Sequence, residues 1–420
     1  GDVYKRQGEQ KIVVLSAMSG TTNTLVEISD YLYKKNPEGA NEIINKLEAK
    51  YKQHIDELFA TQEYKQKGLE VVKSHFDYIR SYTKDLFTLF EEKVVLAQGE
   101  LISTAMVNFY LQECGVKSVL LPALEFMRTD KNAEPDPVYI KDKLRAQLDL
   151  YPDTEIYITQ GFICRNAYGE IDNLQRGGSD YTASLIGAAV NASEIQIWTD
   201  IDGMHNNDPR IVDKTAPVRQ LHFEEAAELA YFGAKILHPT CIQPAKYANI
   251  PVRLLNTMDP EAPGTLISND TEKGKIKAVA AKDNITAIKI KSSRMLLAHG
   301  FLRKVFEIFE SYQTSIDMIC TSEVGVSVTI DNTKHLNEIL DDLKKYGTVT
   351  VDKEMCIICV VGDLEWENVG FEAKALDAMR DIPVRMISFG GSNYNISFLI
   401  RECDKKVALQ SLSDMLFNGK

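Results

Sequence analysis

The order of strand-like and helix-like segments changes once along this 420-residue chain, and the change limits what the chain can fold into. In the first two thirds, short apolar runs such as 11–16, 116–121 and 194–199 alternate with stretches of helical periodicity. This alternation predicts a parallel or mixed sheet with helices on both faces. Ligands of such sheets bind beyond the carboxyl ends of the strands, so the loops there are where we expect the chemistry.

The composition shifts to Pro, Gly, Asn, Asp and Lys at about 259–275, which predicts a domain boundary. Beyond it, the pattern strand, helix, strand, strand, helix, strand occurs almost twice, as expected for two ferredoxin-like units. We therefore expect an α/β protein with domains at 1–265, 280–352 and 353–420.

Charge and cysteine usage exclude several classes of partner. Lys and Arg total 48 against 60 Asp and Glu, a net charge of −12 that repels nucleic-acid phosphates. No apolar run approaches the roughly 18 residues of a membrane span, so we expect no membrane partner. Seven scattered cysteines favour reduced thiols and a cytoplasmic location. Cys356 and Cys359 have redox or zinc spacing, but their apolar surroundings predict buried strand residues.

The sharpest motif is Gln-Arg-Gly-Gly-Ser-Asp at 175–180, directly before a helical run at 181–191. The two glycines allow a ligand to approach the backbone, and Ser179 or Asp180 is expected to cap the helix. Arg176 has the planar fork that suits a carboxylate or phosphate. The alternative is a tight turn with a capping residue and a surface arginine.

Two further clusters suggest contacts with a nucleotide, one after a strand and the other after a glycine at a helix end. Trp-Thr-Asp-Ile-Asp-Gly at 198–203 continues to Asp208 and Arg210, whose polar groups suit ribose, phosphate or Mg²⁺. Lys235, in Phe-Gly-Ala-Lys-Ile-Leu-His-Pro, could reach a phosphate or complement the negative end of a helix. The alternative for 198–210 is a solvated loop.

Two shorter motifs complete the set. Gly99-Glu100 is expected to open a helix at 101–111, with an ordinary acidic first turn as the alternative. Thr22 lies in a hydroxyl-rich turn at 16–23 and could contact a ligand or cap a helix. The chain has neither a P-loop nor a Gly-x-Gly-x-x-Gly motif. The histidines lack ligand spacing, so we propose no protein side chains as metal ligands.

In this order, the motifs resemble those of the aspartokinase family, and in detail its lysine-sensitive, single-function class. The resemblance also includes Ile-Thr-Gln-Gly-Phe-Ile at 158–163, His-Gly-Phe-Leu-Arg-Lys-Val-Phe at 299–306 and Ser-Ile-Asp-Met-Ile-Cys-Thr-Ser-Glu-Val at 315–324. It extends from about residue 12 to the C-terminus. It implies an amino-acid kinase-type α/β/α sandwich followed by two ferredoxin-like ACT domains.

The implied reaction is phosphoryl transfer from ATP, with Mg²⁺, to the β-carboxylate of L-aspartate, the first step toward lysine, threonine and methionine. By the resemblance, Asp180 and Arg176 are catalytic. Substrate would be bound by Thr22, Glu100, Phe162, Arg176, Ser179 and Asp180. ATP would be bound by Thr199, Asp200, His205, Asp208, Arg210 and Lys235. The family usually has Tyr where this chain has His205, so we expect altered ATP affinity.

The resemblance also implies feedback inhibition by L-lysine. An acidic side chain should bind the extra ammonium group of lysine, and the candidates are Asp317 and Glu323. The full effector set would be Met295, Phe301, Leu302, Ser315, Asp317, Ser322 and Glu323. We hypothesise that lysine bridges ACT units in a homodimer or higher homo-oligomer and shifts the kinase to an inactive arrangement.

Family members begin with a strand leading into Lys-Phe-Gly-Gly-Thr-Ser, and this chain begins without it. We expect an N-terminally incomplete kinase domain, in which the loss of the phosphate-loop Lys costs on the order of 10²–10³ in rate. One alternative is a catalytically silent, ACT-containing amino-acid-binding protein. Another is a kinase acting on glutamate or N-acetylglutamate.

Overall fold

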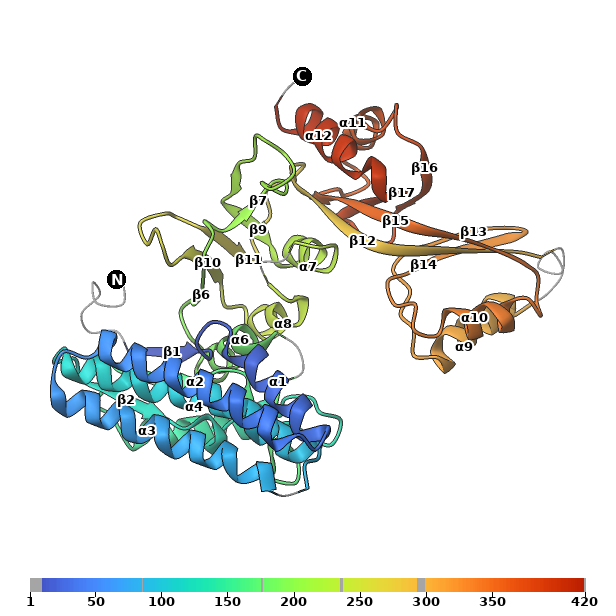
Figure 1. Ribbon diagram of the computed structural model, residues 1–420. Helices are drawn as coiled ribbons and strands as arrows, with labels where there is room; N and C mark the ends of the chain where they lie inside the picture. The colour runs from blue at the N-terminus through green and yellow to red at the C-terminus, as the bar shows by residue number, and fades with distance from the viewer. Residues whose placement is uncertain (1–9, 85, 175–176, 235–236, 293–298, 419–420) are drawn as a thin grey trace. The chain divides into compact units, whose positions relative to one another are not determined.

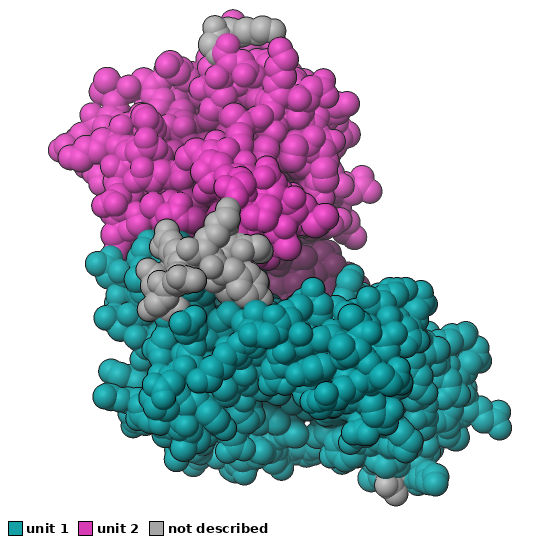
Figure 2. Space-filling view, turned by 90° about the vertical axis from the view of Figure 1, so that its left-hand side faces the viewer, with its two compact units in different colours: residues 1–197, 240–252 teal, residues 198–239, 253–420 magenta. Residues whose placement is uncertain are grey.

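A computed structural model describes residues 10–84, 86–174, 177–234, 237–292 and 299–418. It divides into two compact units, one of residues 1–197 and 240–252 and the other of residues 198–239 and 253–420 (Figure 2). The expectation of a missing first strand concerns a part of the chain that lies outside the described residues.

The first unit is built on a parallel three-stranded sheet in the order β1 (Lys11–Leu15), β3 (Ile156–Gln160), β2 (Ser118–Leu121). Its register aligns Ile158 of β3 with Val13 on one side and Leu120 on the other. Every residue of the central strand β3 is buried. The predicted alternation of strands and helices therefore produces a sheet covered on both faces.

Two apolar clusters hold the helices of this unit. One joins four helices that lie side by side in Figure 1, with Ile28, Tyr51, Phe76 and Val95 at its centre. These are α1 (Thr21–Tyr33), α2 (Pro37–Leu58), α3 (Gln62–Ser81) and α4 (Leu89–Glu113). The second cluster packs α5 (Pro137–Asp149) and α6 (Gly178–Val190) with the sheet. The hairpin β4 (Ile163–Arg165) and β5 (Ile171–Asn173) and helix α8 (Pro239–Ala248) complete the unit.

Helix α4 is the one helix among the described residues with the length and apolar composition of a membrane span. Most of that apolar stretch is buried inside the protein, together with the polar side chains of Gln98, Glu100 and Asn108. A capping box at Thr88 and Glu91 fixes its first turn. Its packing is therefore that of a core helix.

The second unit begins with a four-stranded sheet in the order β6 (Ile195–Thr199), β10 (Val252–Asn256), β11 (Thr265–Ser268), β9 (Gln220–His222). Strands β6 and β10 start in the last residues of the first unit. The short pair β7 (Met204–His205) and β8 (Pro217–Val218) and the helix α7 (Phe223–Tyr231) lie between β6 and β10 in sequence.

Two long antiparallel strands, β12 (Ile276–Lys291) and β15 (Thr348–Gly362), organise the rest of this unit (Figure 1). They are the middle strands of a six-stranded sheet in the order β13-β14-β12-β15-β17-β16. The others are β13 (Ile319–Ser322), β14 (Gly325–Ile330), β16 (Val384–Phe389) and β17 (Asn395–Arg401). Its helices are α9 (Phe301–Ser311), α10 (Leu336–Leu343), α11 (Phe371–Ala378) and α12 (Lys405–Leu416).

Each long strand serves both ferredoxin-like repeats. The second half of β12 and the first half of β15 belong with β13 and β14, and the remaining halves belong with β16 and β17. The strand that closes the second repeat is therefore the segment around Ala280, which pairs with Cys359 and precedes the whole first repeat. The domain ranges 1–265, 280–352 and 353–420 remain a prediction. Cys356 and Cys359 are fully buried in β15, as their apolar surroundings predicted.

Candidate active site

Gly99 and Glu100 lie in the middle of α4, which begins at Leu89. The expectation that Glu100 opens a helix is therefore wrong, because the capping box starts the helix eleven residues earlier. A β-carbon on Gly99 would lie 2.8 Å from the β-carbon of Ala17, closer than side chains tolerate. Glycine at 99 thus allows α4 to approach the turn that follows β1.

Glu100 is a buried carboxylate with an incomplete set of partners. Its Oε1 accepts a hydrogen bond from the backbone N–H of Ala17 at 3.3 Å. Its Oε2 is buried and has no hydrogen-bond partner among the described residues. Burial raises the pKa of Glu100 to about 7. A free oxygen on a buried acid is suited to a cationic group brought by a ligand.

Two hydroxyl groups from other helices lie near this carboxylate. The hydroxyls of Thr21 and Tyr51 are 2.9 Å apart. Burial, and after it the charge of Glu100, raises the pKa of Tyr51. Thr22, which the sequence singled out, is half-buried in the same first turn of α1 as Thr21. Tyr51 was missed because it belongs to a long amphipathic helix without a local motif.

The turn after β3 touches the first turn of α6. A β-carbon on Gly161 would lie 2.5 Å from the β-carbon of Ser179 and 2.7 Å from its Cα. Phe162 follows with a left-handed backbone (φ +69°) and donates its N–H to the hydroxyl of Thr182 at 3.0 Å. The structure therefore brings the predicted residues Phe162 and Ser179 into neighbouring turns.

Asp180 occupies the first turn of α6, and its pKa is raised to about 6 by burial. The predicted capping role of Ser179 or Asp180 is wrong, because Gly177 occupies the N-cap with φ +73° and no side chain caps the helix. The N–H groups of this turn favour an anionic ligand. Arg176 lies outside the described residues.

The predicted nucleotide residues follow β6 in the second unit. Thr199 ends the strand, and its Oγ1 accepts the N–H of Ile201 at 3.3 Å. Asp200 is exposed. The neighbouring Asp202 forms two 3.0 Å bonds with Arg219, whose guanidinium lowers the pKa of that carboxyl. Asp202 therefore stabilises the loop after β6 through its ion pair with Arg219, whereas the side chain of Asp200 is exposed to solvent.

Asp208 and Arg210 pair with each other. The carboxylate accepts the side-chain Nε of Arg210 at 2.9 Å and Nη2 at 2.7 Å. This guanidinium lowers the pKa of Asp208. The Nδ1 of His205 lies 2.9 Å from the hydroxyl of Thr215. Lys235 lies outside the described residues.

The predicted effector residues separate into two groups at opposite ends of β13. Asp317 precedes the strand, whereas Ser322 ends it and Glu323 follows. Five residues of extended chain span about 16 Å, so the two groups are not neighbours along the strand. Ser315 is on the side of Asp317, and Phe301 and Leu302 begin α9. Met295 lies outside the described residues.

In the part of the chain that the structure describes, no group of three or more His, Cys, Asp or Glu side chains is arranged to hold a metal ion.

Known proteins resemble this chain along most of its length. Residues 3–256 match the amino acid kinase family, and residues 358–416 match an ACT domain. Aspartokinase 1 of Arabidopsis thaliana is 34% identical over 98% of this chain and 75% of its own length. The lysine-sensitive aspartokinase 3 of Escherichia coli is 31% identical over 99% of this chain and 94% of its own. The chain belongs to the aspartokinase family.

Solved structures agree with this assignment. The E. coli aspartokinase III complex with aspartate and ADP, in its R-state, matches with a TM-score of 0.82 at 31% identity, over 97% of this chain and 93% of that one. Its T-state complex with lysine and aspartate matches with a TM-score of 0.78 at 32% identity, over 97% of this chain and 92% of that one. The predicted resemblance, the fold class and the enzyme class, an aspartate kinase, are confirmed.

Proposed function

We propose that the chain transfers the γ-phosphoryl group of Mg-ATP to the β-carboxylate of L-aspartate and releases 4-phospho-L-aspartate and ADP. The observation that carries this proposal is the buried Glu100 carboxylate, whose Oε2 has no partner among the described residues. The ammonium group of aspartate would donate a hydrogen bond to this oxygen. The E. coli relative that binds aspartate and ADP supports the same substrate pair.

Each charged group of the aspartate would be bound by a side chain of the opposite charge. Glu100 would accept its ammonium, and Arg176 would bind its α-carboxylate with a bidentate fork. Ser179, Phe162 and Thr22 would shape the walls, since Ser179 and Phe162 lie in touching turns. A substrate lacking either the ammonium or the α-carboxylate would leave one of these charges uncompensated.

The nucleotide would be held after β6, by Thr199, Asp200, His205, Asp208, Arg210 and Lys235. Opening of the Asp208–Arg210 pair would present a guanidinium to the phosphates. Mg²⁺ is bound in such sites chiefly by phosphate oxygens and waters, so a cluster of protein ligands is not required. Bound there, it would neutralise the charge of the transferred group.

Catalysis would consist of positioning and charge stabilisation. The β-carboxylate oxygen attacks the γ-phosphorus, the bond to the β-phosphate oxygen breaks, and ADP leaves. Asp180, at the N-terminal turn of α6, would orient the charged groups around this transfer. No proton needs to be removed from an ionised carboxylate. Orientation of the two substrates therefore supplies most of the rate.

We also propose that L-lysine inhibits the reaction as a feedback effector that is bound by two protomers. The E. coli relative has a T-state complex with lysine. In this chain, Asp317 and Ser322 lie at opposite ends of β13, and a lysine bound where the six-stranded sheets of two protomers adjoin could meet Asp317 of one protomer and Ser322 of the other. A homodimer or higher homo-oligomer would provide this. The seven free cysteines support a cytoplasmic location.

Release of ADP in the presence of Mg-ATP tests the reaction. L-aspartate should support it, whereas L-asparagine, which lacks the β-carboxylate, and L-glutamate should not. ADP release with glutamate in place of aspartate would contradict the proposed substrate.

A further inference from the structure

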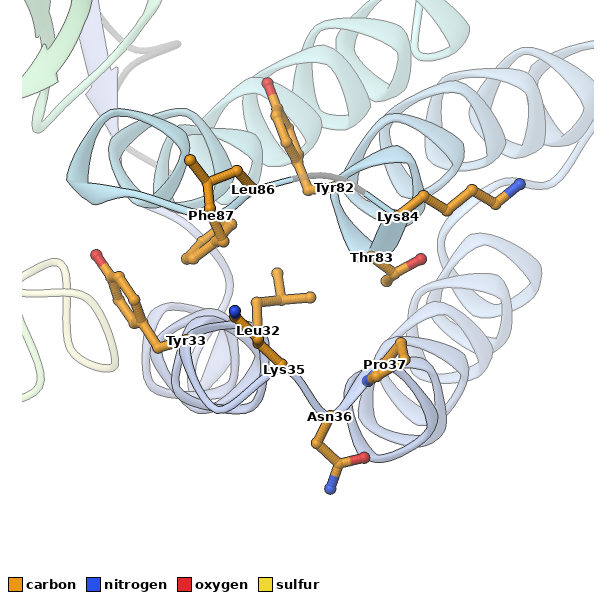
Figure 3. A pocket seen from close by; sticks show the side chains of 10 residues that line it. All are labelled: Leu32, Tyr33, Lys35, Asn36, Pro37, Tyr82, Thr83, Lys84, Leu86 and Phe87. Carbon is orange, nitrogen blue, oxygen red and sulfur yellow. The ribbon is translucent and has the colours of Figure 1, made fainter.

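A cavity of about 390 Å³ opens in the first unit beside the turns that join α1 to α2 and α3 to α4. Its walls include Leu32, Tyr82 and Phe87 (Figure 3). The side chains of Asn36 and Lys84 point away from its centre, and Asn36 caps α2 by accepting the N–H of Gly39 at 2.9 Å. These walls therefore present few polar groups that could orient a ligand.

The loop between β7 and β8 in the second unit has a different construction, and we call its residues 206–216 the nucleotide loop. It carries Asp208 and Arg210, two of the nucleotide contacts proposed above. The backbone N–H of Asn206 donates to the carbonyl of Ala216 at 2.9 Å, and the side-chain Oδ1 of Asn206 accepts the N–H of Ala216 at 3.0 Å. The carbonyl of Asp208 accepts the N–H of Val212 at 3.0 Å. The nucleotide loop is therefore a folded turn closed at its base.

The nucleotide loop is anchored in the core of the second ferredoxin-like repeat. Val212 is 1% exposed and belongs to an apolar cluster that includes Leu409 and Leu412 of α12. The carbonyl of Asn206 accepts the N–H of Val279, in β12, at 2.8 Å. Because protein cores are closely packed, the loop cannot shift far without disturbing this repeat.

Asn207 connects α12 to the residue that pairs with Arg210. The side chain of Asn207 is buried, and its Nδ2 donates to the carbonyl of Leu409 at 3.0 Å across 202 positions of the sequence. Its Oδ1 accepts the backbone N–H of Asp208 at 2.9 Å. A single amide group thus fixes the backbone of Asp208 relative to α12 and, through the ion pair at 2.7 Å, the guanidinium of Arg210.

The apolar contacts of Val212 and the hydrogen bonds of Asn207 contribute differently to the loop. Burial of Val212 holds the loop on the repeat but is non-directional, whereas a hydrogen bond defines an orientation. Without the bond from Asn207 to α12, Asp208 and Arg210 would sample more orientations. The binding of a nucleotide would then have to order them, which lowers affinity.

We propose that Asn207 is a positioning residue for the nucleotide, holding Asp208 and Arg210 in the orientation from which they contact the phosphates. This rests on the ATP binding proposed above for those two residues. The aspartate contacts Glu100, Phe162 and Ser179 belong to other elements, so the role of Asn207 concerns the nucleotide alone.

Calorimetry of Mg-ADP binding to the full chain, together with KM values for ATP and aspartate, tests this role. In Asn207→Ser the short neutral side chain cannot reach Leu409. We expect Mg-ADP binding to weaken and KM for ATP to rise by about three- to tenfold, the scale of one neutral hydrogen bond. KM for aspartate should stay within twofold. The matched control is Asn332→Ser, the same exchange at an exposed residue before α10, which should behave as the unaltered chain does.

Amide hydrogen exchange adds a measurement that needs no variant. In the unaltered chain without nucleotide, the N–H of Asp208 should be protected, because it is bonded to Asn207. Exchange of this N–H at the rate of an unfolded peptide would overturn the fixed orientation even if Asn207→Ser does not fold.

The variant Arg210→Gln separates the positioning role from the nucleotide site itself. If Arg210→Gln binds Mg-ADP more weakly and Asn207→Ser binds it normally, the positioning role is wrong and the nucleotide contacts stand. A rise in KM for aspartate equal to that for ATP in Asn207→Ser would likewise overturn the role, because it would indicate a general loss of structure. If Arg210→Gln binds Mg-ADP as tightly as the unaltered chain, the proposed contact of Arg210 fails, and the positioning role fails with it.

Discussion

Glu100 receives one hydrogen bond from the protein, a 3.3 Å bond from the N–H of Ala17, and leaves its second oxygen buried and unpaired among the described residues. The same burial raises its pKa to about 7. A residue placed for stability alone would not be an acid in this position. The destabilisation caused by burying this acid is explained if the ammonium of aspartate binds its second oxygen.

Replacement of Glu100 by Gln should lower kcat/KM for aspartate by roughly 100-fold, because the substrate ammonium loses its charged partner. Steady-state kinetics with Mg-ATP in excess measures this loss. Glu92→Gln, a change on the same helix at a half-buried carboxylate that accepts a hydrogen bond from the hydroxyl of Tyr33, is the matched control and should leave kcat/KM within twofold. A Glu100→Gln enzyme with unaltered kcat/KM would remove Glu100 from the site.

The same substitution should stabilise the fold above neutral pH. The folded pKa of Glu100 is raised above its unfolded value, so the stabilisation present at low pH is lost as pH rises through about 7. Gln has no such loss. We expect the free energy of unfolding of Glu100→Gln to exceed that of the unaltered chain by about 1–3 kcal/mol at pH 8 and to match it near pH 4. Urea unfolding at the two pH values provides the measurement, and equal differences at both would contradict the assigned cause.

Activity should depend on the same ionisation. The free enzyme needs Glu100 as a carboxylate to accept an ammonium, so kcat/KM for aspartate should fall as pH drops below about 7. Asp180, whose pKa is about 6, should add a second and steeper decline below that value. A pH profile of kcat/KM from 5 to 9 would reveal both steps. A flat profile down to pH 5.5 would show that neither acid acts in its ionised form.

Gly161→Ala should disturb the substrate walls without removing a functional group. Its new β-carbon would lie 2.7 Å from the backbone Cα of Ser179, so the two turns must separate. We expect a loss of about 1–3 kcal/mol in unfolding free energy and a raised KM for aspartate. Gly325→Ala, whose β-carbon would meet nothing closer than 3.5 Å, is the control. Normal stability and KM in Gly161→Ala would mean that the turns do not touch as described.

Tyr231→Phe should weaken the link between lysine and catalysis. The change removes the hydroxyl that donates to Asp317 and keeps the ring beside Lys282. We expect lysine binding within about threefold of normal and a smaller maximal inhibition of ADP release, because the coupling energy falls. If the variant is inhibited as fully as the unaltered enzyme, the hydrogen bond between Tyr231 and Asp317 does not couple lysine binding to catalysis.

The sequence located the motifs better than it located their structural setting. Ser179 and Phe162 lie in neighbouring turns. Glu100 was placed at a helix start because an apolar core helix such as α4 gives no periodic boundary at its centre. The predicted capping role of Ser179 or Asp180 was wrong because Gly177 adopts a left-handed backbone at the N-cap, which no sequence pattern indicates. Tyr51 reaches the site through tertiary packing, which no local pattern records.

The regulatory half illustrates the same difference in another way. Its two repeats were visible in the order of strands and helices. The strand around Ala280 closes the second repeat by pairing with the segment around Cys359. It was not assigned to that repeat because it precedes the first repeat in the sequence. The ion pair between Lys282 and Asp317 could not be predicted either, because the two residues are 35 positions apart in the sequence.

The most direct test of the account is formation of aspartyl hydroxamate from L-aspartate, Mg-ATP and hydroxylamine, measured with and without L-lysine beside the Glu100→Gln variant. We predict product from the unaltered chain, suppression of that product by lysine, and a roughly 100-fold lower kcat/KM for the variant. Absence of product from a folded chain that binds both substrates would contradict the proposed reaction. Equal product from both proteins would contradict the role of Glu100.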